Sequence, residues 1–169
     1  EEVTGIDLVQ TQIRLAEGAS LASLGLDEAA ARPRGFAIQA RVNLETIEAD
    51  GSVRPGGGTL TAYEAPSGPG VRTDGFGYAG YRTSTSYDSL LAKVIAHAPS
   101  PRFEEAVARA SLALQEFRIE GATTNIPFLA NVIGHDDFVN ARVHTRWVDE
   151  NVATLALPRD LPRRLRRRP

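Results

Sequence analysis

Apolar side chains recur at helical spacing over residues 6–17, and Gly18 stands where a glycine often ends a helix. This pattern predicts an amphipathic helix, followed by a short turn of helix over residues 21–26. Over residues 36–43 the period changes, because apolar residues now alternate with polar ones. Alternation of this kind predicts a half-buried strand.

Further along the chain, short stretches of β-branched and aromatic residues are separated by Gly and Pro, which predicts a compact antiparallel sheet. Residues 90–97 are assigned to a strand because Val94 and Ile95 are β-branched. A helix is predicted over residues 103–117, where apolar side chains line one face. The remaining predicted elements are strands over residues 59–63, 71–73, 78–81 and 118–120 and helices over residues 126–133 and 145–151. The order of elements indicates an α+β fold.

The composition excludes several kinds of site. With 169 residues the chain is long enough for one domain with a sizeable core. It contains no Cys, which excludes a disulfide framework and a cysteine zinc site, and its three His lack ligand spacing, so we expect no metal site. No apolar run could span a bilayer and no signal peptide is visible, so we expect a cytoplasmic protein without membrane contact. Met is absent even at position 1, which indicates a piece of a longer protein.

The net charge of -2 conceals a basic end, because residues 159–169 carry six Arg and a single Asp. Binding of nucleic acid is the alternative that such a run raises. We favour a solvated linker or tail over residues 152–169, because the basic run has no aromatic residues to stack on bases and contains two of the chain's prolines. No nucleic-acid partner is therefore expected.

Two short motifs could hold an anion. Residues 75–80 match the dinucleotide pattern G-x-G-x-x-G, but polar extended chain follows them instead of a helix, so we assign these glycines to bends and turns. In residues 66–72, two Pro and two Gly fix a tight path that ends at Arg72. Its guanidinium is either a fixed ligand for a carboxylate, phosphate or enolate oxygen or one partner of an ion pair with Asp74 or Asp88.

Seven stretches, in the same order and spacing, resemble the C-terminal part of the biotin carboxylase component of biotin-dependent carboxylases. The matching stretches are residues 1–9 (EEVTGIDLV), 37–43 (AIQARVN), 70–72 (GVR), 78–81 (YAGY), 87–93 (YDSLLAK), 124–129 (TNIPFL) and 145–149 (TRWVD). The resemblance covers residues 1–151, and the basic segment over residues 152–169 lies beyond it. It implies a biotin carboxylase C-terminal domain whose ATP-grasp part precedes this chain.

Enzymes of this family use ATP, Mg²⁺ and bicarbonate to carboxylate biotin on a carrier domain, and a carboxyltransferase then passes the carboxyl group on. The resemblance implies that Arg72 stabilises the enolate-like oxygen of biotin and that Thr145 and Arg146 lie near the adenine of ATP. It also implies a homodimer, with His97 and residues 99–102 in the matching region. The phosphate and metal ligands of the family have no match here, so the chain is expected to be inactive alone.

For the fold we expect an antiparallel sheet curled into a barrel-like sandwich with flanking helices. One alternative to the enzymatic interpretation is an autonomous β-rich module that binds a ligand or docks a subunit, without a catalytic Arg. The presence or absence of an ATP-grasp pattern upstream in the gene distinguishes these two hypotheses. The nucleic-acid hypothesis, which depends on residues 159–169, is tested by a salt titration of DNA binding.

Overall fold

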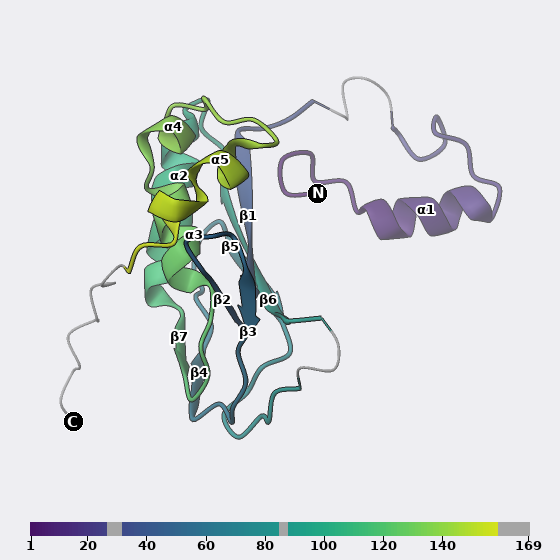
Figure 1. Cartoon of the computed structure of the whole chain (residues 1–169). Helices are drawn as coiled ribbons and strands as arrows, with labels where there is room; N and C mark the ends of the chain where they lie inside the picture. Colours follow the sequence, from purple (N-terminus) through teal and green to yellow (C-terminus); the bar gives the residue numbers. More distant parts are fainter. Residues whose placement is uncertain (27–31, 85–87, 159–169) are drawn as a thin grey trace.

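The structure is a computed structural model that describes residues 1–26, 32–84 and 88–158. Of the linker or tail predicted over residues 152–169, residues 159–169 lie outside the described residues, whereas residues 152–155 belong to the last helix and Leu155 is buried. The elements in chain order are α1 (Leu8–Ala16), β1 (Phe36–Asn43), β2 (Glu45–Ile47), β3 (Val53–Pro55), β4 (Ala62–Glu64), β5 (Val71–Gly75), β6 (Leu90–Ala98), α2 (Phe103–Glu116), β7 (Arg118–Glu120), α3 (Ile126–Ile133), α4 (Asp136–Val139) and α5 (Trp147–Leu155). The α+β class predicted from the sequence is confirmed (Figure 1).

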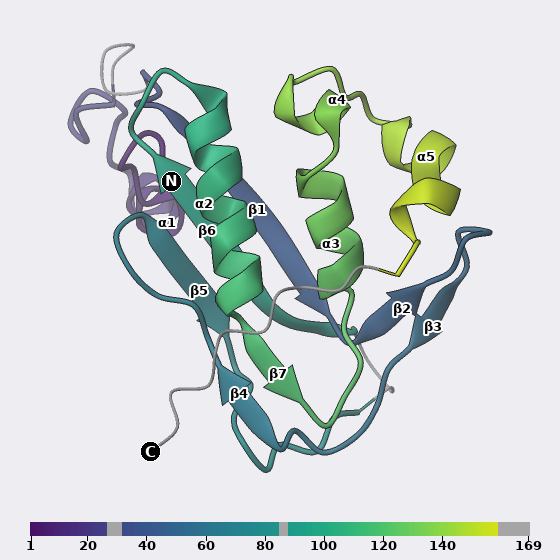
Figure 2. The same cartoon turned by 90° about the vertical axis from the view of Figure 1, so that its left-hand side faces the viewer.

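The largest sheet has three antiparallel strands in the order β1-β6-β5 (Figure 2). The long central strand β6 pairs with β1 from Phe36 opposite Ala98 to Asn43 opposite Leu90, with an irregularity in the register between Val42 and Asn43. On its other side β6 pairs with the shorter β5. Residues 90–97, which the sequence assigned to a strand, therefore belong to the central strand of the main sheet.

One face of this sheet is covered by helices, and the main core lies between them. Helix α2 packs across β6 and β1, because its apolar side chains fall on a single face. Helix α3, with a proline in its first turn, packs beside α2 and against β1. Their buried partners on the sheet are Ala40, Val42, Ala92, Val94 and Ala96. Small and β-branched side chains on the strands allow the helices to approach closely.

The remaining strands form two separate antiparallel pairs, the hairpin of β2 with β3 and the pair of β4 with β7, whose strands are far apart in the chain. A second, small cluster of buried leucines, Leu44, Leu60 and Leu91, lies where these pairs meet the main sheet. The described residues form no closed barrel and no sandwich of two sheets, so the barrel-like sandwich expected from the sequence is not seen. The physical reason is that α2 and α3 cover the apolar face that a second sheet would otherwise cover.

Most predicted elements are present, with shifted ends. The strand predicted over residues 78–81 is wrong, because these residues form a turn in which Tyr81 N donates to Tyr78 O and Gly80 has a φ of 94°. The strand predicted over residues 59–63 is shifted to β4, and the last helix starts at Trp147 and continues to Leu155. Residues 21–25 form hydrogen-bonded turns in which Leu24 N donates to Ser20 O and Gly25 N donates to Ala22 O, as in the short turn of helix predicted there. The sequence patterns missed β2, β3 and α4.

Helix α1 stands apart from the main sheet and the helices that cover it. In Figure 1, α1 lies beside the open side of the sheet, at a distance from the helices on the other side. No residue of α1 is buried. No helix among the described residues is long and apolar enough to cross a membrane.

Candidate functional site

Arg72 lies on β5, on the face of the sheet that the helices leave open. Side chains alternate along a strand, and Val71 packs against the main core, so Arg72 and Asp74 project from the opposite face. The side chain of Arg72 is 44% exposed. The sequence motif that ends at Arg72 therefore delivers this guanidinium to the surface and not to the core.

The tight segment before β5 fixes where the strand begins. Val71 N donates to Gly68 O, and Thr73 Oγ1 donates to Pro66 O at 3.1 Å. Gly70 has a φ of 70°, and a Cβ at this position would collide with Arg109 Nη1 and with the carbonyl oxygen of His97. Only glycine fits both the conformation and the space. The position of Arg72 therefore depends on Gly70, two residues upstream.

Two rows of side chains cross the open face from β1 through β6 to β5. The first row consists of Gln39, Ile95 and Arg72, and the second consists of Arg41, Lys93 and Asp74. Residues directly opposite on neighbouring strands have close Cβ atoms, so the members of each row are neighbours. The open face thus combines three cationic groups with one carboxylate.

The guanidinium of Arg72 is bound by three carboxylates. Its Nε and Nη2 donate to the two oxygens of Asp74, at 3.1 Å each, and its Nη1 donates to Glu2 Oε1 at 2.6 Å. A longer contact of 3.4 Å joins Nη2 to Glu1 Oε2. The pKa of Arg72 is raised above its ordinary value, chiefly by the hydrogen bond to Asp74. Arg72 is therefore a permanent cation whose planar group is held in one orientation.

The two ion-pair alternatives for Arg72 are thereby separated. Asp74 is a partner of Arg72, and its Oδ2 also lies 3.7 Å from Lys93 Nζ. Asp88 pairs instead with Arg41, at 3.4 Å. Asp74 binds the guanidinium at Nε and Nη2, whereas Nη1 donates to Glu2 at the start of the chain. The geometry can therefore bind an oxygen anion at Nη1 if that anion replaces Glu2.

Thr145 and Arg146 lie on the other side of the sheet from Arg72. Both are exposed, and Arg146 is the residue that precedes the first turn of α5. Helix α5 packs on α3, which in turn covers the helical face of β1, so the structure does not bring these two residues to Arg72 (Figure 2). The next residue, Trp147, is buried. Its ring lies edge-on to the ring of His135, with 4.9 Å between the ring centroids.

The sequence analysis missed the contribution of Glu1 and Glu2, which are far from Arg72 along the chain. It also did not place Gln39 and Lys93 beside Arg72. The alternation in β1 and β6 carried a usable signal, because it assigns both residues to the polar face. The described residues contain no group of three His, Cys, Asp or Glu that could hold a metal ion.

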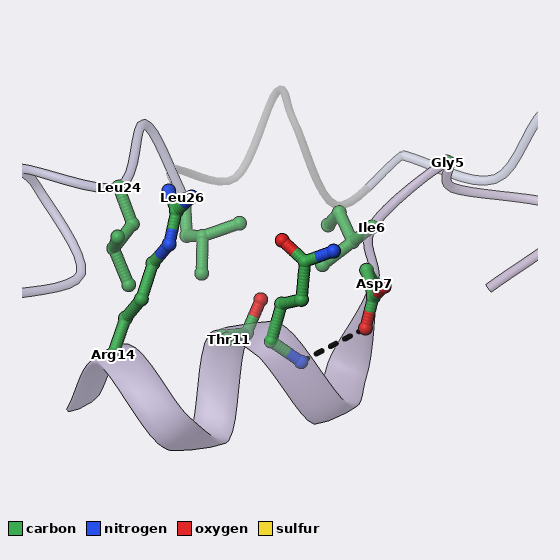
Figure 3. A pocket seen from close by; sticks show the side chains of 8 residues that line it. Gly5, Ile6, Asp7, Thr11, Arg14, Leu24 and Leu26 are labelled. Atoms are coloured by element: carbon green, nitrogen blue, oxygen red, sulfur yellow. Dashed lines mark hydrogen bonds between the residues drawn. The ribbon is translucent and has the colours of Figure 1, made fainter. Parts of the chain in front are cut away.

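A shallow hollow of about 240 Å³ lies on the N-terminal segment (Figure 3). Its lining comes from α1, from the residues just before it and from Leu24 and Leu26. It contains no arrangement of a nucleophile and a base. We therefore take the open face around Arg72 as the candidate functional site.

Comparison with known proteins relates this chain to carboxylases. The family described as biotin carboxylase C-terminal domain matches residues 39–150. Pyruvate carboxylase 1 of Caenorhabditis elegans is 43% identical over 152 residues, which are 89% of this chain and 13% of that protein. This chain therefore spans only a small part of such relatives.

Two solved structures have the same fold over nearly the whole chain. A single-chain, multi-domain long-chain acyl-CoA carboxylase is 44% identical with a TM-score of 0.84, and the match covers 92% of this chain and 17% of that one. The biotin carboxylase domain of the Hydrogenobacter thermophilus 2-oxoglutarate carboxylase, solved as a dimer with MgADP and bicarbonate, is 34% identical with a TM-score of 0.81 and coverages of 94% and 33%. With a family match over most of its residues, this chain belongs to the biotin carboxylase C-terminal domain family.

Proposed function

We propose that this chain is the C-terminal part of a biotin carboxylase and that it supplies Arg72 to the biotin site. The parent enzyme would use ATP and bicarbonate to carboxylate biotin on a carrier domain, with the cytoplasm as its compartment. The observation that carries the proposal is the arrangement of Arg72, which is held from one side by Asp74 and offers Nη1 to an oxygen anion.

The chemistry of the guanidinium fits this role. When bound, biotin supplies the nitrogen that accepts the carboxyl group, and its ring oxygen gains negative charge as that nitrogen becomes nucleophilic. Arg72 would donate to this oxygen in place of Glu2 and stabilise the charge as it develops. Asp74 would keep the guanidinium in position, so that little reorganisation is needed during the reaction.

The other groups required by the reaction would come from outside the described residues. No set of metal ligands is present among them, so we assign no step at Mg²⁺ to this chain. An ATP-grasp part, a carrier domain and a carboxyltransferase are the proposed partners. Thr145 and Arg146 are proposed to approach the adenine from the helical side of the sheet, separately from Arg72. The 2-oxoglutarate carboxylase relative was solved as a dimer, which supports the proposal of a homodimer.

The test replaces Arg72 in the parent enzyme. Arg72→Ala should lower biotin-dependent ATP hydrolysis by about 10²- to 10³-fold, the scale for loss of one preorganised donor. Arg72→Lys should also be poor, because an ammonium lacks the planar fork. Bicarbonate-dependent ATP hydrolysis without biotin should fall much less. The melting temperature should move little, since exposed ion pairs contribute about 0–1 kcal/mol.

Arg118→Ala provides a matched control. Arg118 is 48% exposed and also binds two carboxylates, Glu64 and Glu120, but it lies on β7 and not on the open face. We expect this variant to keep biotin-dependent activity. If Arg72→Ala and Arg118→Ala lowered both activities equally, or if Arg72→Ala destabilised the protein by several kcal/mol as expected for a buried ion pair, Arg72 would be structural.

A further inference from the structure

Lys93 is the only lysine of a chain that otherwise uses arginine for its basic side chains. Nineteen residues are Lys or Arg, and eighteen of them are Arg. Lys93 lies in the middle of the central strand β6, opposite Asp74 on β5 and opposite Arg41 on β1. The chain thus departs from its preference for arginine at the position next to the carboxylate that binds Arg72.

Asp74 binds two cations. Its Oδ1 accepts from Nε of Arg72 and its Oδ2 accepts from Nη2, at 3.1 Å each. The ammonium of Lys93 lies 3.7 Å from the same Oδ2. Arg72 therefore uses both oxygens of Asp74, whereas Lys93 places a positive charge beside one of them and displaces neither donor of Arg72.

Arg41, on the other side of Lys93, favours this arrangement. Like charges that stand directly opposite each other on neighbouring strands repel. Arg41 has a carboxylate of its own, because its Nη2 lies 3.4 Å from Asp88 Oδ2. The ammonium of Lys93 is thus attracted toward β5 by Asp74 and repelled from β1 by Arg41.

An arginine at position 93 would act differently. A guanidinium carries its N–H donors in a rigid planar fork and binds a carboxylate through two of them. Opposite Asp74, such a fork would compete with Arg72 for the two carboxylate oxygens. An ammonium has no fork, so it can stabilise the charge of Asp74 without taking this carboxylate from Arg72.

We propose that Lys93 is a positioning residue for Arg72 and that this role requires lysine. Its ammonium holds Asp74 in the orientation that binds Nε and Nη2 of Arg72, which leaves Nη1 for the oxygen of biotin. Lys93 acts through Asp74 and Arg72 and donates to no substrate. The inference rests on the proposed function, because the orientation of Arg72 affects the reaction only if Arg72 acts at the biotin site.

Two substitutions in the parent enzyme test the requirement for lysine. Lys93→Gln removes the charge and should lower kcat of biotin-dependent ATP hydrolysis by about 1.4- to 5-fold, the scale of one ion pair whose members are each 37% exposed. Lys93→Arg keeps the charge but should lower kcat by about tenfold or more, because misplacement of a reacting group can cost about 10²-fold. A role of positive charge alone would give the opposite order. Activity of Lys93→Arg equal to or above that of Lys93→Gln would therefore overturn the proposal.

Arg54→Lys is the matched control. It exchanges the same two cations in an exposed ion pair, that of Arg54 with Glu48, away from the open face. We expect this variant to keep biotin-dependent activity. In all three variants, the melting temperature and bicarbonate-dependent ATP hydrolysis without biotin should change little. If Lys93→Arg lowered both activities equally, the substitution would disturb the fold in general, and the proposal would be overturned.

A crystal structure of the Lys93→Arg parent enzyme separates this inference from the proposed function. The introduced guanidinium should bind Asp74 through two donors, and Arg72 should lose at least one of its hydrogen bonds to Asp74. If Asp74 still bound Nε and Nη2 of Arg72, the proposal for Lys93 would be wrong. Full biotin-dependent activity of Arg72→Ala would instead contradict the proposed function, whatever the structure of the Lys93 variant shows.

Discussion

Arg72 and Asp74 are two positions apart on β5, and this spacing brings both side chains to the open face with their charged groups in contact. Asp74 binds the edge of the guanidinium opposite to Nη1, which leaves Nη1 for an exchangeable anion. It also approaches Lys93 on the neighbouring strand. Asp74 is therefore a positioning residue in the proposed site, because it acts through Arg72.

Asp74→Asn tests this positioning role in the parent enzyme. The amide keeps a similar shape but loses the charge, so we expect biotin-dependent ATP hydrolysis to fall by about 1.4- to 5-fold, the scale of an exposed ion pair of about 0.2–1 kcal/mol. The loss should appear mainly in kcat and should be much smaller than for Arg72→Ala. Steady-state kinetics with free biotin measure both effects. A loss as large as that of Arg72→Ala would assign Asp74 a direct part in the reaction.

At the scale of elements, the start of α3 is fixed to β1 by Asn125, which is 5% exposed. Its Oδ1 accepts from Asn43 N at 2.9 Å and its Nδ2 donates to Arg41 O at 3.1 Å, next to the register irregularity of β1. The period of the apolar residues predicted both elements. It could not predict this link, because the partners are more than eighty residues apart in the chain.

The same reasoning explains what was predicted at the candidate site. The Gly and Pro before Arg72 are a local signal, and they correctly indicated the tight path that leads to Arg72. Asp74 was one of the two ion-pair partners considered, the other being Asp88, and it is also close to Arg72 in the chain. Glu1, Glu2 and the cross-strand neighbours depend on long-range pairing, which no local pattern contains. In the described part of the chain no second sheet packs on the main sheet, and this likewise depends on which helix covers which face.

A further link between elements lies between α4 and α5. Arg142 donates to Asp137 Oδ1 at 3.0 Å, and the indole of Trp147 approaches Asp137 Oδ2 at 3.4 Å. The hydrogen bond from Arg142, followed by that from Trp147, holds the pKa of Asp137 below its ordinary value of 3.8. A carboxyl with a lowered pKa in the folded state stabilises the fold above its unfolded pKa. That contribution disappears as the pH falls through the folded pKa.

Asp137→Asn should therefore lower the melting temperature at pH 7 but not at acid pH. The difference between the variant and the unmodified chain should begin to shrink below about pH 4, near the ordinary pKa of aspartate. Thermal unfolding followed by circular dichroism over a pH series measures this convergence. A difference that stays constant to the lowest pH would show that the charge of Asp137 has no part in stability.

At the scale of the whole molecule, the structure has two unlike sides. One side of the main sheet is covered by α2 and α3, and the other carries the open face with α1 standing beside it (Figure 1). Arg102 lies at a third place, where the chain enters α2, and its side chain is 70% exposed. Among the described residues it forms an ion pair with Glu105, three positions along the chain, at 2.6 Å. Its exposure leaves it available to a second subunit.

Charge reversal at Arg102 tests the proposed homodimer of the parent enzyme. Arg102→Glu should raise the dissociation constant of the dimer by about tenfold or more. The substitution removes the attraction between Arg102 and an acidic group of the second subunit and replaces it with repulsion between like charges. Sedimentation equilibrium measures this constant. Arg54→Glu is the control, since Arg54 is 73% exposed and pairs locally with Glu48 on a different part of the surface. If the dimer were unaffected by Arg102→Glu, the interface would lie elsewhere.

The free edge of β5 has a consequence for self-association. Only one side of β5 is paired with another strand of the described chain, so its other side presents backbone donors and acceptors that could recruit a strand from another molecule. The strand is short, it follows closely after Pro69, and its exposed face carries Arg72 and Asp74. Short length, proline and charge are the features that block edge-to-edge aggregation in natural sheets. Arg72 and Asp74, which we propose for the biotin site, therefore also hinder association of β5 with a strand of another molecule. Replacing either residue should increase aggregation in addition to lowering activity.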